Sequence, residues 1–308
     1  MDDAPDSLRG FTLIEMAIVL VIIGLIVGGV LVGQDLIRAA EVRATISQIE
    51  KYQTAVNTFY GKYGALPGDL NQQVATMFGF APRGTLEGQG DGNGLIEGVA
   101  NSDGAFPGGG FLGFGETTMF WADLSKAGLI DGTFTAASGD VWPGTISGTA
   151  LDSYYPQAKL GRGNYIYAWS GGWVWFWSLN GGDGLNYFGI SALQLLDGGI
   201  VEGNTTISVA QAYAIDTKVD DGLPQAGRVT AMYSDESCGG WAAAGGDNGD
   251  CGDSDPNGGP VVAGDGVATA PSATTCYDNA NVAGATEKYS IGQNSGSGPN
   301  CALSFRFQ

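Results

Sequence analysis

The side chains in this chain that could do chemistry are mostly carboxylates. The chain has 32 Asp and Glu residues and no histidine, which excludes Ser-His-Asp and Cys-His nucleophilic sites and imidazole-based zinc sites. Ca²⁺ requires hard oxygen ligands, often with glycine at the bend. The candidate ligands are Asp91, Asn93 and Glu97 in GDGNGLIEG, then Asp216, Asp220 and Asp221, and then Asp247, Asp250, Asp253 and Asp255.

Turn chemistry alone also accounts for these three acidic groups. Asp and Gly are good turn residues, and the full EF-hand pattern is absent. We therefore expect the globular head, residues 64–308, either to bind calcium or to bind no cofactor. We prefer the second interpretation, in which the acidic groups only form turns. An enzyme that uses paired carboxylates is not indicated by any other feature, so we expect no catalytic activity.

The four cysteines all lie in the last quarter of the chain and form no CxxC motif. Such clustering in a glycine-rich tail indicates two disulfides and an oxidising compartment. Three connectivities are open. We prefer Cys238 with Cys251 and Cys276 with Cys301, because both pairs close local loops; free buried thiols are the alternative.

Glu15 is the only ionised side chain in an apolar run from Phe11 to Val32. A run of about 22 residues spans roughly 30 Å as a helix, which is enough to cross a bilayer. A carboxylate in such a run costs roughly 2.5–3.5 kcal/mol on insertion scales for charged residues. A plain membrane anchor does not explain why it is there.

The hexapeptide GFTLIE, Gly10 to Glu15, followed by this apolar helix, resembles the class III signal of type IV pilins and type II secretion pseudopilins. The resemblance implies a leader at residues 1–10, cleavage between Gly10 and Phe11 by a prepilin peptidase, and N-methylation of the Phe11 amine. It also implies that Glu15 pairs with the Phe11 amine of a neighbouring subunit. We expect Glu15 to be poorly satisfied in a single chain and satisfied at one axial offset in the assembly.

Two features depart from the family pattern. The leader carries Asp2, Asp3 and Asp6 against Arg9, whereas family leaders are usually basic. The apolar helix has no proline and carries glycines instead, which lower helix propensity but allow close helix packing. We expect either local melting or tight packing in a filament core at Gly24, Gly28, Gly29 and Gly33.

The helix is predicted to continue beyond the membrane-length run to about Tyr63. Apolar residues recur at helical spacing on one face, with Gln53 as an interruption, and Asp35 can pair with Arg38 across one turn. Gly64 and Pro67 are predicted to end the helix. The face consists of Val42, Ile46, Ile49, Val56, Phe59 and Tyr63.

From residue 64 to 308 the pattern changes to short runs separated by Gly, Pro, Asn and Asp. Helices are predicted at Phe120–Ile130 and within Thr205–Val229, the latter with Thr205 or Thr206 as N-cap. Aromatic runs around Gly171-Gly172 predict a β-hairpin, with a third run at Leu185–Ile190 and a last strand at Cys301–Phe307. The run with Trp173, Trp175 and Trp177 predicts a buried strand, with an aromatic ligand platform as the alternative.

The predicted fold is therefore α+β and pilin-like: a long N-terminal helix over residues 11–63, with a transmembrane or filament-core half at 11–32 and an amphipathic half, packed on a globular head with a β-sheet. The predicted function is a subunit of a type IV pilus-like filament. A type II secretion pseudopilin or an adhesive minor or tip pilin is the alternative, and a membrane-anchored ligand-binding protein is a rival from another class. LPGD at Leu66–Asp69 and the segment from Ile215 to Gly227 resemble parts of long pilin-like heads.

The predicted partners are other copies of the chain in a helical homopolymer, the prepilin peptidase and the inner-membrane assembly machinery. We expect the precursor in the inner membrane and the product in a cell-surface filament, or in the periplasm if it is a pseudopilin. The net charge is -19. A surface of that charge repels phosphate backbones, so bulk nucleic-acid binding is not expected.

Overall fold

A computed structural model describes residues 12–86, 88–98, 115–135, 137, 144–170, 184–197, 200–231 and 270–308. The chain divides into two compact units, Met1–Glu41 and Val42–Gln308. The predicted leader, the cleavage position and the tryptophan run lie outside the described residues. The predicted turn at Gly171-Gly172, the cysteines 238 and 251 and the acidic group at 247–255 also lie outside them.

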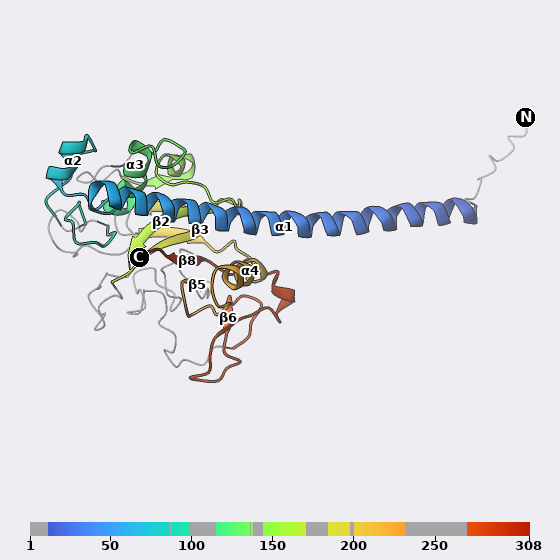
Figure 1. The fold of residues 1–308 in the computed structure, drawn as a ribbon. Coiled ribbons are helices and arrows are strands. Elements are labelled where there is room, and N and C mark those ends of the chain that lie inside the picture. The colour runs from blue at the N-terminus through green and yellow to red at the C-terminus, as the bar shows by residue number, and fades with distance from the viewer. Residues whose placement is uncertain are drawn as a thin grey trace, which may run out of the picture. The chain divides into compact units, whose positions relative to one another are not determined.

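The longest element is the helix α1, Leu13–Tyr63, which confirms the predicted continuous helix (Figure 1). It ends as predicted at Gly64, whose amide donates a hydrogen bond to the Tyr60 carbonyl at 2.8 Å. The backbone φ angle of Gly64 is 78°. A positive φ is accessible to glycine at little cost, so Gly64 stops the helix. Asp35 and Arg38 form the expected pair at 3.8 Å.

The unit from Val42 onward combines helices with a six-stranded sheet and a two-stranded sheet, so the α+β prediction is confirmed. Its further elements are α2 (Gln72–Phe78), α3 (Glu116–Lys126), β1 (Ile146–Ser147), the 3-10 helix η1 (Gly148–Ser153), β2 (Tyr165–Ser170), β3 (Asn186–Asp197), β4 (Ile200–Asn204), α4 (Val209–Val219), β5 (Val229–Ala231), β6 (Tyr277–Asp278), β7 (Lys288–Tyr289), the 3-10 helix η2 (Asn294–Gly296) and β8 (Leu303–Arg306).

Strand β3 organises the larger sheet because different parts of it pair with different strands. Its first half pairs antiparallel with β2 and with β8, and its second half pairs with β4 and β1. An irregularity between Leu193 and Leu195 interrupts the pairing of the second half with β4. Strand β5 extends the sheet beyond β8. The first aromatic run therefore pairs with the third, and the last predicted strand is confirmed over Leu303–Arg306.

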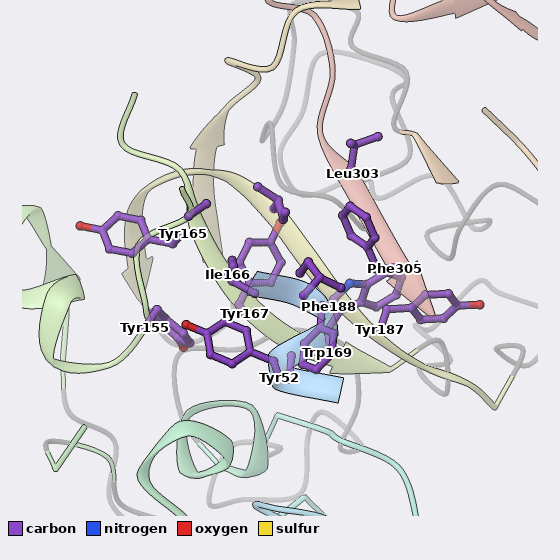
Figure 2. Close-up of a cluster of buried hydrophobic side chains, with 14 of the residues drawn as sticks. Tyr52, Tyr155, Tyr165, Ile166, Tyr167, Trp169, Tyr187, Phe188, Leu303 and Phe305 are labelled. Atoms are coloured by element: carbon purple, nitrogen blue, oxygen red, sulfur yellow. The ribbon is translucent and has the colours of Figure 1, made fainter. Parts of the chain in front are cut away.

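An aromatic core joins the second half of α1 to this sheet. The Tyr52 ring lies 4.9 Å from that of Trp121 on α3 and 6.3 Å from that of Phe188 on β3, and Figure 2 shows Tyr52 of α1 beside the strand residues. The predicted face of α1 is confirmed. Val42, Ile49, Val56 and Phe59 are buried, whereas Ile46 and Tyr63 are half-buried.

Two helix predictions need correction. Helix α3 begins at Glu116, four residues before the predicted start, and ends at Lys126. Its first turn, Glu116-Thr117-Thr118, is polar in sequence but buried in the fold, so apolar periodicity could not reveal it. Helix α4 is capped by Ser208, not by Thr205 or Thr206. The Ser208 side chain and the Gln211 side chain form a capping box, whose signature is S-x-x-Q.

Candidate functional site

The start of α1 is closed by a capping box. Thr12 lies one residue before the helix, and its hydroxyl accepts a hydrogen bond from the Glu15 amide at 3.3 Å. The Glu15 Oε2 atom accepts from the Thr12 amide and from the Thr12 hydroxyl, both at 2.8 Å. This reciprocal arrangement satisfies two donors that a helix start leaves free. We expected the Glu15 carboxylate to be poorly satisfied in a single chain. For hydrogen bonding this expectation is wrong, because the carboxylate has two donors within its own chain.

The residues that follow form an apolar surface on all sides of the helix. Every large apolar side chain from Leu13 to Val32 is exposed, from 44% for Met16 to 88% for Leu13. Within the described part of the chain, α1 is the one helix long and apolar enough to cross a membrane, by length and composition. An apolar surface of this extent requires lipid or protein against it. Glu15 is the one carboxylate in that run.

The three glycines of this run and Gly33, which follows it, do not interrupt the helix, which is continuous from Leu13 to Tyr63. Local melting, one of the two expected outcomes, is not seen. A Cβ atom added at Gly24, Gly28, Gly29 or Gly33 would meet nothing within 4 Å. The surface at these positions is therefore open to another helix, and close packing in a filament stays a prediction.

In the head, the first predicted calcium group is arranged differently from the prediction. The side-chain nitrogen Nδ2 of Asn93 donates to Asp91 Oδ2 at 3.3 Å and to Glu97 Oε2 at 2.8 Å, so it occupies the space between those carboxylates. The carboxylate oxygens that converge to within 4.8 Å belong instead to Asp69, Asp91 and Glu116. Asp69 and Glu116 were missed because their proximity depends on the fold.

Burial dominates the chemistry of this first acidic cluster. Asp69 and Glu116 are 1% and 0% exposed. Burial raises the pKa of Asp69 to about 6 and raises that of Glu116 well above its ordinary value, with the Asp69 charge as a second cause for Glu116. Backbone amides of Gly92 and Gly94 donate to Asp69 at 2.6 and 2.9 Å and partly offset the shift.

The second predicted group is brought together as expected. Carboxylate oxygens of Asp216, Asp220 and Asp221 lie within 4.8 Å of one another. Asp216 is buried and accepts from the Tyr289 hydroxyl at 2.8 Å and from the Gly222 amide at 3.1 Å. Burial raises the pKa of Asp216 to about 7. Each group has internal hydrogen-bond partners, so turn chemistry accounts for both, and calcium binding stays a prediction.

The C-terminal part of the head is held by a disulfide between Cys276 and Cys301, with a Cα–Cα distance of 5.1 Å. This confirms one of the two preferred pairs. Both cysteines are fully buried. The bond ties the residue before β6 to a position two residues before β8, so it secures a strand of the central sheet.

Comparison with known proteins agrees with the geometry at the start of the chain. Residues 8–31 match the prokaryotic N-terminal methylation motif. This match supports a type IV pilin-like class III signal and points to a structural, pilin-like or pseudopilin-like protein, with processing by a prepilin peptidase implied in general. A search of curated proteins and a search of solved structures each found no match.

Proposed function

We propose that this chain is a prepilin that is cleaved between Gly10 and Phe11, N-methylated at Phe11, and assembled into a type IV pilus-like filament through its N-terminal helix. The observation that carries the proposal is one carboxylate, Glu15, near the start of an exposed apolar helix surface within the matched motif. The precursor would be anchored in the inner membrane, and the assembled helices would bundle in the filament core.

The hydrogen bonds of Glu15 support this role. Thr12 supplies two donors to the carboxylate but no positive charge. A buried carboxylate without a counter-charge remains costly even when it is hydrogen-bonded, whereas an ion pair with good geometry offsets much of that cost. The methylated amine of a neighbour's Phe11 would provide the charge that Thr12 lacks. Assembly would then gain free energy at the one axial offset that brings the two groups together.

The head has an extensive aromatic core and a buried disulfide, which suit an oxidising compartment outside the inner membrane. We favour a surface filament over a periplasmic pseudopilus. A pseudopilin or a minor pilin with an adhesive role would share the same N-terminal chemistry. These alternatives differ in where the processed chain accumulates, so fractionation separates them.

The first experiment is to shear cells, collect the filament fraction, and determine the N-terminus of this protein by mass spectrometry. N-methyl-Phe11 in sheared filaments is the expected result. A processed chain found only in membranes would favour the pseudopilin or a scarce minor pilin. A chain that still begins at Met1 would overturn the proposal.

The second experiment separates the charge of Glu15 from its capping role. Glu15→Gln keeps a side chain that a capping box accepts but removes the charge, and Glu15→Ala removes both. Both variants should reach the membrane and lose most filament assembly. Unchanged fibre yield in both would instead favour a membrane-anchored binding protein.

A further inference from the structure

A hollow in the head is bordered by three basic side chains, Lys218, Arg228 and Arg306, and we call it the basic groove. Its walls come from the second half of α1, the end of α4 and strand β8, and its volume is about 160 Å³. The remaining lining residues are Ile46, Ile49, Glu50, Gln53, Phe188, Val219, Phe305 and Phe307. The three basic residues are exposed, whereas the phenylalanines are buried.

Arg228 and Arg306 lie directly opposite each other on neighbouring strands. The Arg306 amide donates to the Arg228 carbonyl at 2.8 Å, which continues the register of β5 and β8 by one residue. Like charges at directly opposed positions destabilise a sheet. An anion bound between or above the two guanidinium groups would remove this repulsion.

Within the described residues, ion pairs engage Arg38, Lys51 and Arg83, whereas the three cations of the basic groove form none, as is also true of the other described basic side chains. The Arg228 guanidinium donates at 3.4 Å to the neutral side chain of Gln53. One acidic residue, Glu50, lines the groove against three basic ones. The lining residues therefore carry a net positive charge on a chain with 13 basic and 32 acidic residues, and the carboxylate of Asp220 lies beside them, where it accepts a hydrogen bond from the Arg228 backbone amide.

The size of the groove favours a protein side chain as its occupant. Small-molecule sites are typically about 300–1,000 Å³, and this hollow of about 160 Å³ is smaller. It is still much larger than the space one water molecule needs. An acidic side chain with its methylene groups suits the basic rim and the apolar floor.

We infer that the basic groove receives an acidic side chain from a second copy of this chain, so that it forms a contact between subunits. Charge complementarity selects this occupant, because a chain with a net charge of -19 presents carboxylates to its neighbours. The inference rests on the proposed filament, in which copies lie close together. The contact would let strongly acidic heads pack despite their net repulsion.

Zero-length carbodiimide cross-linking of assembled fibres tests this contact. Fibres are formed from a mixture of unlabelled and ¹⁵N-labelled processed chains, and linked peptides are identified by mass spectrometry. Lys218 should be joined to an Asp or Glu in mixed-isotope pairs. Lys51 provides an internal control, because its ammonium lies 2.5 Å from Asp131 of the same chain and should yield same-isotope pairs.

Charge reversal provides an independent readout. Arg228→Glu with Arg306→Glu should lower fibre yield by about tenfold or more, since juxtaposed like charges weaken an interface strongly. The same residues changed to lysine should retain most assembly. The matched control, Lys62→Glu with Lys126→Glu, makes the same change in net charge at exposed positions outside the groove and should have little effect.

The outcomes distinguish this inference from the filament proposal. If the unmodified chain forms no fibres, the filament proposal fails. If fibres form, but Lys218 gives no mixed-isotope link and the charge-reversed chain assembles like the control, the subunit contact is overturned. Normal fibre formation while a small carboxylate such as acetate occupies the groove would also overturn the subunit contact.

Discussion

The carboxylate of Glu15 accepts two hydrogen bonds from Thr12, one from the backbone amide and one from the hydroxyl, both at 2.8 Å. The residue proposed to select the neighbour in a filament therefore also caps its own helix. Because Thr12 contributes no positive charge, the capping box leaves room for a stronger partner. In the proposed assembly, Glu15 would form an ion pair with the amine of a neighbouring subunit. This ion pair would either coexist with the hydrogen bonds from Thr12 or replace them.

Thr12→Val should loosen the first turn of α1 while Thr12→Ser leaves it unchanged. Valine keeps the shape of threonine but removes the hydroxyl that accepts from the Glu15 amide at 3.3 Å. Loss of such a cap costs about 1 kcal/mol, equivalent to about fivefold faster exchange of first-turn amides. Hydrogen–deuterium exchange of the full chain in detergent micelles measures this. Equal exchange rates in the two variants would show that the hydroxyl does not stabilise the helix start.

The folded chain should lose stability as pH rises from about 4 to about 7. Burial raises the pKa of Asp216 from 3.8 to about 7, and that of Asp69 to about 6. Between these values and the ordinary pKa, the folded chain retains protons that the unfolded chain has released, so the free energy of unfolding falls as pH rises. Urea unfolding at several pH values, with a chelator present, measures the slope.

Asp216→Asn is the matched test of that slope. Asparagine keeps an oxygen that can accept from the Gly222 amide but cannot titrate, so the fall in stability between pH 4 and 7 should become shallower. Repeating the measurement with Ca²⁺ in place of the chelator tests the calcium prediction. A bound cation would hold the carboxylates ionised and reduce the pH slope of the unmodified chain. A variant with the original slope would show that Asp216 does not titrate in this range.

Removal of the Cys276–Cys301 bond should lower the free energy of unfolding by about 3 kcal/mol, from the entropy of closing its loop in the unfolded chain. The sequence separation is 25 residues. Cys276→Ala with Cys301→Ala avoids placing hydroxyl groups in this buried site. Urea unfolding of the detergent-solubilised chain measures the loss. A loss well below 1 kcal/mol would mean that native packing alone secures β8.

Local sequence patterns predicted the helices better than they predicted the contacts of the head. Unbroken periodicity predicted α1 to its last turn, because Gly64 and the apolar face act locally. The pairing of β2 with β3 depends on residues far apart in sequence, and so does the meeting of Asp69 with Glu116. The two capping boxes, unlike these long-range contacts, have local sequence signatures. T-x-x-E at Thr12 and S-x-x-Q at Ser208 were visible in the sequence and could have been predicted.

The buried ion pair between Arg83 and Asp123 could not be predicted from sequence either, and it gives the largest expected loss of stability. The Nη2 atom of Arg83 lies 2.5 Å from Oδ2 of Asp123, and the two side chains are 0% and 2% exposed. The same Asp123 oxygen accepts from the Gly68 amide at 2.7 Å, and Arg83 also donates to the Leu70 carbonyl at 3.2 Å. The pair therefore fastens the segment after α1 to helix α3.

Arg83→Met should lower the free energy of unfolding by about 3–5 kcal/mol, because Asp123 would remain buried without its counter-charge. Lys51→Met is the control: it breaks the exposed Lys51–Asp131 pair, whose side chains are 53% and 94% exposed, and should cost at most about 1 kcal/mol. Arg83→Met combined with Asp123→Leu should recover part of the loss, since both charges are then gone. Urea unfolding of the unmodified chain, of each single variant (Arg83→Met and Asp123→Leu) and of the double variant gives the coupling between the two positions. If Arg83→Met costs no more than Lys51→Met, the buried charge is solvated or neutralised and the pair does not hold the two segments together.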